Sequence, residues 1–271
     1  MPTIPPLHVH APLHEMNPTG RFSERAEDYV RFRPSYPVAA VDTVLAGLGD
    51  PASLTAADIG AGTGISARLL ANRGVKVIAI EPNRAMRDVA EPHPLVVFRE
   101  GTAEATGLDD TSVDLAFAAQ AFHWFRADEA LREFARILRP GARLALVWNR
   151  RDGEDPFTTG YRAALHEVGV ESRVEQMEFD PGLIERSEFF SRFRHCEFPN
   201  QQHLDLEGLV GRAMSASYVP NTGPAATKIV ALLHALHARH ADAEGRVTLL
   251  YATEVYLADR TGERPPSRSS H

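Results

Sequence analysis

An acid followed by three glycines at alternate positions, in the run DIGAGTG, is the feature of this sequence that most clearly points to chemistry. Asp58 ends an apolar stretch typical of a buried strand, and Gly60, Gly62 and Gly64 lead into a helical pattern. In an open α/β sheet, ligands bind beyond the carboxyl ends of the strands, where glycines allow tight turns and close approach of backbone amides. The run therefore predicts a nucleotide-like cofactor.

The same run argues against a dinucleotide. The fingerprint GxGxxG requires a glycine at position 65, where this chain has Ile65. A carboxylate such as Asp58 would also repel a pyrophosphate, whereas it can orient a cationic amine and the glycine loop. A sulfonium amino acid fits better than a diphosphate, and an NAD(P)-dependent oxidoreductase is the alternative.

A second acid follows the next apolar run, VKVIAIEPN. Glu81 lies 17 residues beyond Gly64, where the acid of a Rossmann-type fold accepts hydrogen bonds from ribose hydroxyls. Its two acceptor oxygens suit a vicinal diol. Ala103 and Glu104 follow the third apolar run and can flank an adenine, while Gln120 closes the fourth run at the same rim of the sheet.

Four ring-bearing residues, Phe122, His123, Trp124 and Phe125, come just after the fourth apolar run, where an acceptor substrate would approach. Histidine is suited to removing a proton near neutral pH, so His123 is a candidate general base. The three aromatic residues can form a wall for a flat or apolar acceptor. The alternative is that these rings pack against the sheet.

The segment before the first strand also carries polar candidates. Tyr29, Arg33 and Tyr36 can form a helix and turn that cover the cofactor. A guanidinium there can grip a carboxylate in a bidentate manner. An amphipathic helix packed on the sheet is the alternative.

The elements that must position these residues alternate in type between residues 54 and 148. Short β-prone runs, LTAADI, VKVIAI, PLVVF, VDLAFA and RLALVW, are separated by amphipathic stretches. The clearest helix runs over residues 128–138 and ends at Arg139, Pro140 and Gly141. Regular alternation of strand and helix predicts a doubly wound α/β fold, with a parallel sheet covered by helices on both faces.

After residue 148 the order changes. A helix is expected near residues 157–168, a strand at 193–198 and a last strand at 247–258. Residues from about 200 to 245 have helical patterning and are too numerous for a hairpin loop, which predicts a helical lid over the active site, with Met214 and Tyr218 facing the acceptor. The expected organisation is a flexible segment (1–20), one domain (21–260) and a flexible tail (261–271).

Composition restricts the partners. A net charge of -7 gives no general attraction to phosphate backbones or anionic membranes, so we expect no nucleic-acid or membrane partner. No secretory signal or long apolar segment is visible, which predicts a cytoplasmic protein. His234, His237 and His240 recur in steps of three, which drift around a helix, so we expect no metal site. The oligomeric state is left open.

Several runs together carry a resemblance to a known family. DIGAGTG, EPN, GTAEATGLDDTSVDLAFAAQAFHWF and FARILRPGARLALVWN resemble the methyltransferase type 11 group of class I S-adenosylmethionine (SAM)-dependent methyltransferases, including trans-aconitate-methyltransferase-like proteins. FSERAEDYVRFRPSYP and VTLLYATEVYLA are similar to segments of that group as well.

The resemblance implies a Rossmann-like, seven-stranded and mostly parallel sheet whose last strand is antiparallel. It implies methyl transfer from SAM to a small-molecule acceptor by in-line displacement, with S-adenosylhomocysteine as product; a SAM-binding module without activity is a further alternative. The residues then expected to bind the cofactor are Tyr29, Arg33, Tyr36, Asp58, Gly60, Ala61, Gly62, Gly64, Glu81, Pro82, Ala103, Glu104 and Gln120.

Overall fold

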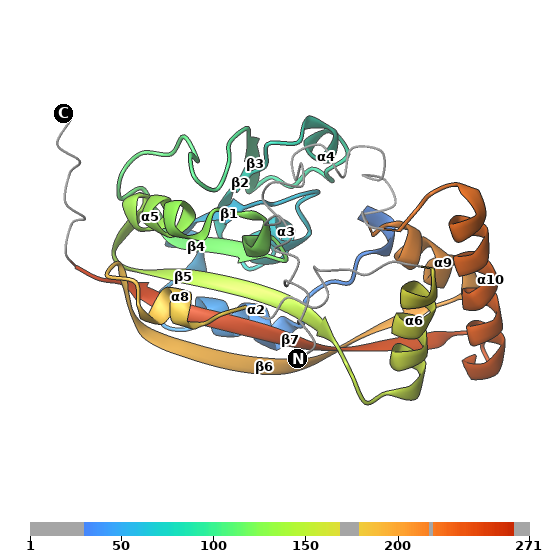
Figure 1. Ribbon diagram of the computed structural model, residues 1–271. Coiled ribbons are helices and arrows are strands. Elements are labelled where there is room, and N and C mark those ends of the chain that lie inside the picture. Colours follow the sequence, from blue (N-terminus) through green and yellow to red (C-terminus); the bar gives the residue numbers. More distant parts are fainter. Residues whose placement is uncertain (1–29, 169–178, 217–218, 263–271) are drawn as a thin grey trace, which may run out of the picture.

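One seven-stranded sheet organises the chain. The computed structural model describes residues 30–168, 179–216 and 219–262 (Figure 1). The strand order is β3-β2-β1-β4-β5-β7-β6; β1 to β5 are parallel, and β7 runs antiparallel to both of its neighbours. The predicted doubly wound, mostly parallel sheet is confirmed. The strands are β1 (Thr55–Ile59), β2 (Lys76–Ile80), β3 (Val96–Arg99), β4 (Val113–Ala119), β5 (Leu138–Arg151), β6 (Phe190–Leu204) and β7 (Val247–Arg260).

Helices cover both faces of the sheet, as predicted. Side chains alternate along a strand, so Leu115 and Phe117 of β4 pack with α2 and α3, while Ala116 and Ala118 pack with α5 and α8 on the other face. The predicted helix at 128–138 is α5, and its last helical residue precedes the expected Arg-Pro-Gly stop. The helices of this region are α2 (Val38–Leu45), η3 (Pro51–Ser53), α3 (Ile65–Ala71), α4 (Arg84–Asp88), η4 (Phe122–Trp124), α5 (Ala127–Ile137) and α8 (Gly182–Glu185).

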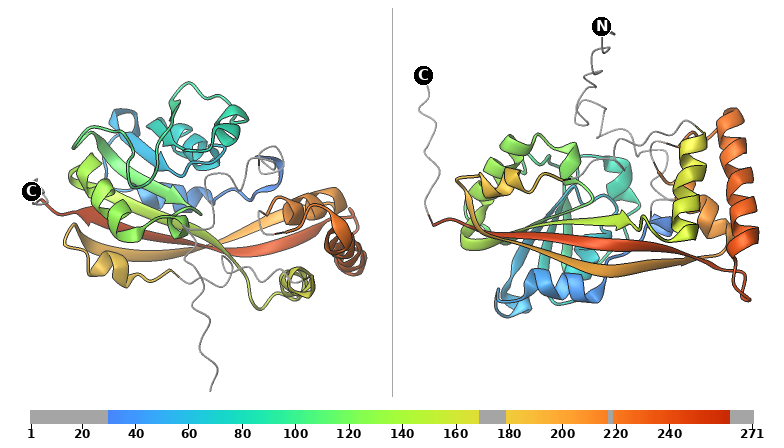
Figure 2. Two further views of the ribbon diagram at one scale, coloured as in Figure 1. Left: turned by 45° about the horizontal axis from the view of Figure 1, so that its top comes forward. Right: turned by 60° about the horizontal axis from the view of Figure 1, so that its bottom comes forward.

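A separate helical unit stands at one end of the sheet. Helices α6 (Pro156–Glu167), α9 (Leu206–Met214) and α10 (Gly223–His240) gather there around the ends of β6 and β7, which run on past the last paired residue of β5 (Figures 1 and 2). At Gly160 of α6, an added Cβ would lie 2.8 Å from Leu236 of α10, so the glycine lets these two helices approach closely.

The helical unit is larger than the sequence predicts. The expected insertion at about 200–245 contains α9 and α10, but α6 belongs to the same apolar cluster. The predicted strand at 193–198 also extends further, because β6 pairs with β7 from Phe190 to Leu204, with one irregularity between Ser191 and Arg194. Among the helices of the described ranges, none is both long enough and apolar enough to cross a membrane.

One buried acid fastens the loop after β3 to α5. Glu133 is 9% exposed, and its Oε1 accepts hydrogen bonds from the Thr106 amide at 2.9 Å and from the Thr106 hydroxyl at 2.6 Å. Arg136 donates to both carboxylate oxygens. Burial alone would raise the pKa of Glu133, but these hydrogen bonds outweigh it and hold the pKa below the usual 4.5.

We expect Glu133→Gln to lower the free energy of unfolding at pH 7 by about 1–2 kcal/mol, because a neutral amide weakens the charged hydrogen bonds. The lowered pKa stabilises the fold above pH 4.5, and this contribution disappears as pH falls through the folded-state pKa. Urea unfolding at pH 7 and near pH 3 measures the difference. Glu129→Gln, on the exposed side of the same helix, is the control; an equal effect in both variants would contradict the assignment.

Candidate active site

The glycine loop between β1 and α3 has a backbone that other residues rarely adopt. The φ angles of Gly60, Gly62 and Gly64 are +70°, +58° and +78°. A Cβ at Gly60 would also lie 2.7 Å from the Cβ of Ala121. All three glycines therefore suit the left-handed turns, and Gly60 also allows the close approach of the chain after β4.

Glu81, directly after β2, supports this loop. The carboxylate is 8% exposed; its Oε2 accepts a hydrogen bond from the Gly62 amide and its Oε1 from the Asn83 amide, both at 2.9 Å. Burial raises the pKa of Glu81, and the two amides oppose that rise. Each carboxylate oxygen keeps acceptor capacity beyond one hydrogen bond, so the group can still accept hydrogen bonds from a vicinal diol.

Asp58 lies beneath the loop and does not reach the pocket wall. It is fully buried, and its Oδ2 accepts a 2.6 Å hydrogen bond from the Ser66 hydroxyl. Its Oδ1 has no hydrogen-bond partner of good geometry in the described part of the chain. Burial raises the pKa of Asp58 to about 7, with Ser66 opposing the rise and Glu81 adding to it. Asp58 is thus not among the residues that line the pocket, whereas Ser66, which donates a hydrogen bond to it, is.

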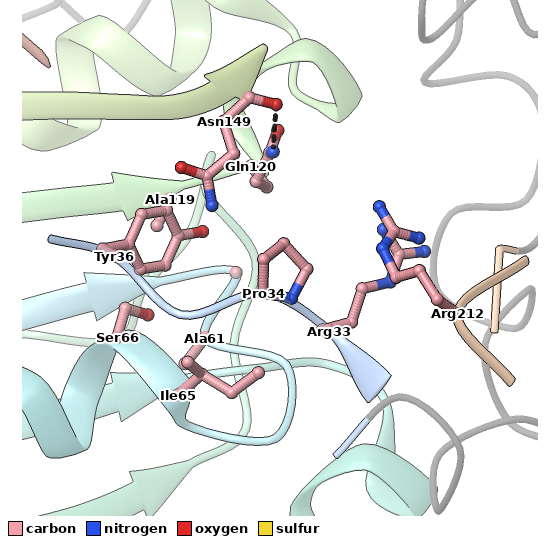
Figure 3. A pocket seen from close by; sticks show the side chains of 11 residues that line it. Arg33, Pro34, Tyr36, Ala61, Ile65, Ser66, Ala119, Gln120, Asn149 and Arg212 are labelled. Carbon is pink, nitrogen blue, oxygen red and sulfur yellow. Dashed lines mark hydrogen bonds between the residues drawn. The ribbon is translucent and has the colours of Figure 1, made fainter. Parts of the chain in front are cut away.

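A pocket opens between the glycine loop and the helical unit (Figure 3). It collects residues from the segment before α2, from the loop and first turn of α3, from the ends of β4 and β5, and from α9. Of the residues expected to bind the cofactor, it contains five. The lining residues are Arg33, Pro34, Tyr36, Gly60, Ala61, Ile65, Ser66, Ala119, Gln120, Asn149 and Arg212.

The sequence did not single out Ser66, Asn149 or Arg212. Asn149, near the end of β5, is 9% exposed and accepts hydrogen bonds at its Oδ1 from Thr253 at 2.5 Å and from Asn200 at 3.1 Å. Its amide nitrogen donates to the Ser35 carbonyl. Asn149 thus connects three strands to the segment before α2. It can do so only because the pairing of β5, β6 and β7 places Asn149, Asn200 and Thr253 side by side.

Gln120 is positioned by its backbone. Its φ is +53°, which is uncommon for a residue with a side chain, and its Nε2 donates to the Asn149 carbonyl at 3.1 Å. The side chain lies at the carboxyl end of β4, across the pocket from the glycine loop, in agreement with the rim position expected from sequence (Figure 3).

The residues expected near an adenine do not line this pocket. Ala103 is 3% exposed and belongs to the core between the sheet and α5. Glu104 accepts a hydrogen bond at its Oε1 from the Arg126 amide at 2.9 Å. The carbonyl of Pro82 accepts one from Arg87. Of these, Glu104 and Pro82 stay half-buried at the same edge of the sheet as Glu81.

The rings expected to form an aromatic wall after β4 do not line the pocket. Phe122 points inward and is 3% exposed, because its ring packs against Phe125, Phe134 and Phe179 with centroids 5.7–6.4 Å apart. Phe125 is half-buried in the same cluster and lies against Gly60. Neither these two rings nor Trp124 lines the pocket that the described residues form.

His123 is held as a neutral ring. Its Nδ1 accepts a hydrogen bond from the Trp148 indole at 3.2 Å, which leaves the proton of the neutral ring on Nε2. Burial, and to a smaller extent the positive charge of Arg33, lowers the pKa of His123 to about 4. Both observations count against the general base expected at this position, since neither ring nitrogen is free to accept a proton near pH 7.

The remaining predicted site residues divide into three groups. Arg33 and Tyr36 line the pocket, and the Arg33 guanidinium donates to the Ser215 carbonyl at 3.2 Å. Met214 packs on the apolar cluster of the helical unit. Tyr29 and Tyr218 lie outside the described residues.

Comparison with known proteins identifies the class. A family model described as a methyltransferase domain matches residues 57–146. A methyltransferase-like protein of Schizosaccharomyces pombe is 33% identical over 73% of this chain and 78% of its own. An uncharacterised methyltransferase of Mycobacterium tuberculosis is 46% identical over 132 residues, and that match spans about half, 53%, of its length. The solved structure of a candidate type II methyltransferase from Anaeromyxobacter dehalogenans superposes with a TM-score of 0.60 at 27% identity, covering 84% of this chain and 97% of that one.

The chain therefore belongs to the class I SAM-dependent methyltransferases. SAM is the cofactor of this class, and the glycine loop, the acid after β2 and the strand order fit it. The more specific likeness to trans-aconitate methyltransferases is not among these matches.

Asp58→Asn is predicted to change the pH dependence of stability. The folded-state pKa near 7 lies above the usual 3.8, so ionisation of Asp58 favours the unfolded chain, and its burial costs stability increasingly as pH rises between these values. The variant should therefore become more stable relative to the natural protein as pH rises from about 4 to about 7, with little further change above that. Urea unfolding of the two unliganded proteins measures this gain. A difference that does not vary with pH would show that the carboxyl ionises normally.

His123 is predicted to stay neutral throughout the physiological range. An NMR titration of the histidine ring nitrogens should show an Nε2-protonated ring at pH 6, with the pKa of His123 near 4. Arg33→Met should raise that pKa, because it removes a positive charge that disfavours the imidazolium. Titration of His123 near 6.5 in the natural protein would restore the general-base hypothesis.

Proposed function

We propose that this chain transfers the methyl group of SAM to a small-molecule acceptor by direct displacement. The observation that carries the proposal is the pocket itself, which joins the glycine loop, Gln120 and Arg33 in one cavity beneath the helical unit. The nucleophilic atom of the acceptor forms a bond to the methyl carbon as the bond from that carbon to sulfur breaks, leaving S-adenosylhomocysteine.

The residues around the pocket fit the parts of SAM. Glu81 is not itself among the lining residues, but it bonds to the glycine loop and has acceptor capacity for ribose hydroxyls. The backbone of Gly60 and Ala61 lines the pocket and leaves room for a ligand against the loop. Ser66, with Asp58 behind it, offers a hydroxyl oxygen to the cofactor's ammonium group. The Arg33 guanidinium is suited to a carboxylate. In SAM the methyl group is bonded to a cationic sulfonium and is transferred away from a neutral thioether. The transfer therefore requires no covalent intermediate on the protein.

The protein's contribution is then mainly alignment. A well-oriented pair of groups can reach an effective molarity on the order of 10^5 M or more, and a displacement at a sulfonium gains chiefly from such orientation. Gln120 is held by its hydrogen bond to the Asn149 carbonyl and lies where the acceptor would meet the methyl group. With His123 neutral, an acceptor that must lose a proton releases it to water or to another group of the pocket.

A small acceptor is supported by the cover over the pocket. Helices α6, α9 and α10 form the lid in this proposal, and α9 reaches the pocket wall through Arg212. The segment 30–36 is bonded to β6 by Gln202 and Asn200 and to the end of α9 by Arg33. A pocket covered in this way excludes water from the reaction.

Residues 21–260 then act as one methyltransferase domain with no nucleic-acid or membrane partner.

Binding of the cofactor tests the proposal directly. Isothermal titration with SAM, S-adenosylhomocysteine, NAD and NADP should show binding of SAM and S-adenosylhomocysteine and no binding of NAD or NADP. Glu81→Gln should weaken SAM binding by about tenfold or more, because it removes a charged acceptor of ribose hydroxyls.

Glu100→Gln is the matched control, since it removes the same charge from an exposed side chain that pairs with Arg87. It should leave SAM affinity unchanged. Binding of NAD or NADP alone, or equal SAM affinity in both variants, would contradict the proposed function and the role of Glu81.

A further inference from the structure

Gln120 has an unusual backbone for a residue with a side chain. Its φ of +53° lies in the left-handed region, and its backbone amide donates to the Val147 carbonyl of β5 at 2.8 Å. The next residue, Ala121, lies against Gly60 of the glycine loop. Such a backbone persists only where the surrounding structure enforces it, and it occurs often at functional sites. The surrounding structure therefore holds Gln120 at the wall of the pocket.

The side-chain amide of Gln120 is fixed in one orientation. Its Nε2 donates to the Asn149 carbonyl at 3.1 Å (Figure 3). The reverse orientation would bring two carbonyl oxygens together, and neither of them can donate a hydrogen bond. Asn149 is itself held in place, since its side chain bonds to Thr253, Asn200 and Ser35. The nitrogen of the Gln120 amide thus faces the protein.

The oxygen of the same amide is left for a ligand. Within the described part of the chain, Oε1 of Gln120 has no hydrogen-bond partner, and the residue is half-buried in the wall of the pocket. A carbonyl oxygen is the negative end of the amide dipole. It is therefore suited either to a hydrogen-bond donor or to a positive charge.

The proposed binding mode of SAM brings a positive charge to this oxygen. Ser66 and Arg33 take the amino acid part of the cofactor and Glu81 takes the ribose, so the sulfonium lies between these two parts. Gln120 faces that place from the end of β4, across the pocket from the glycine loop. An ion and a dipole interact more strongly in a poorly hydrated pocket than in water. The hydrogens of a methyl group on a positive sulfur are also polarised, so they form weak hydrogen bonds to a carbonyl oxygen.

The product of the reaction lacks this charge. S-adenosylhomocysteine differs from SAM only in the missing methyl group and the neutral sulfur. Contacts to the ribose and to the amino acid part therefore hold both molecules equally. A residue that distinguishes the two must act at the sulfur or at the methyl group, and Gln120 is a polar residue of the pocket wall at that place.

We propose that Gln120 makes the pocket prefer SAM to S-adenosylhomocysteine, by directing its side-chain oxygen at the sulfonium and its methyl group. The inference rests on the proposed function and adds a residue that recognises the charge of the cofactor. The contact is lost when the methyl group leaves, which favours exchange of the product for a new molecule of SAM. Asn149 is a positioning residue in this arrangement, because its carbonyl orients the Gln120 amide.

Isothermal titration of SAM and of S-adenosylhomocysteine into Gln120→Met tests this assignment. Methionine is unbranched like glutamine and has no amide dipole. The ratio of the two dissociation constants should shift against SAM by about threefold or more, while the affinity for S-adenosylhomocysteine changes by less than about twofold. A purely structural role of Gln120 would weaken both ligands alike.

Gln120→Gly is a second variant that carries no backbone strain. Glycine adopts a φ of +53° readily, so this variant should fold at least as well as the natural protein and show the same loss of preference. Gln201→Met is the matched control, since it removes an amide from an exposed residue of β6. It should change neither affinity.

Two results would overturn the inference. Equal weakening of both ligands in the two Gln120 variants would show that the side chain only shapes the pocket. An unchanged ratio with unchanged affinities would show that the oxygen does not face the sulfonium. Failure of the natural protein to bind either ligand would instead reject the proposed function, and this inference with it.

Discussion

The hydrogen bond from the Gly62 amide to the Glu81 carboxylate is the interaction on which the site depends. It joins the turn after β1 to the end of β2, and it is possible only because the loop glycines adopt left-handed backbone angles. Glu81 also accepts from Asn83 and so fixes the turn that begins α4. A buried carboxylate is stable when amides satisfy it, and the same carboxylate still presents lone pairs to a ligand.

A second set of polar contacts closes the pocket from the opposite side. Asn149 receives hydrogen bonds from β6 and β7 and donates to the backbone of Ser35, so the sheet, the extended strands and the segment before α2 share one polar centre. The long strands carry the lid, and Phe32 packs on Gly211 in that lid. The helical unit is therefore joined to the sheet through Asn149, which lines the pocket, and through close neighbours of the lining residues Arg33 and Arg212.

The fold could be predicted closely from the sequence. Hydrophobic periodicity and the glycines after a strand are local patterns, and they are sufficient to predict the strands and their order of alternation with helices. All seven expected strands appear, although β5 and β6 are longer than expected. The length of β6 was underestimated because its outer part pairs with β7, whatever the polarity of its exposed side chains. That α6 joins the lid was not predictable either, since the contact between Gly160 and Leu236 links residues far apart in the chain.

The candidate site was predicted in part. Gly60, Gln120 and Arg33 do line one pocket, as strand-end positions and the polar candidates before the first strand suggested. Phe122 and His123 were harder, because only packing decides that one ring turns into the core and the other accepts a hydrogen bond from Trp148. Three further lining residues, Ser66, Asn149 and Arg212, have no local signal. They are recognisable only through partners that the fold brings together.

A crystal structure of the protein with S-adenosylhomocysteine would test the central claim most directly. The account predicts ribose hydroxyls within hydrogen-bonding distance of Glu81, with that carboxylate still bonded to the Gly62 amide. It also predicts the amino acid end of the ligand between Ser66 and Arg33. A ligand bound elsewhere, or a ribose held without Glu81, would contradict the account.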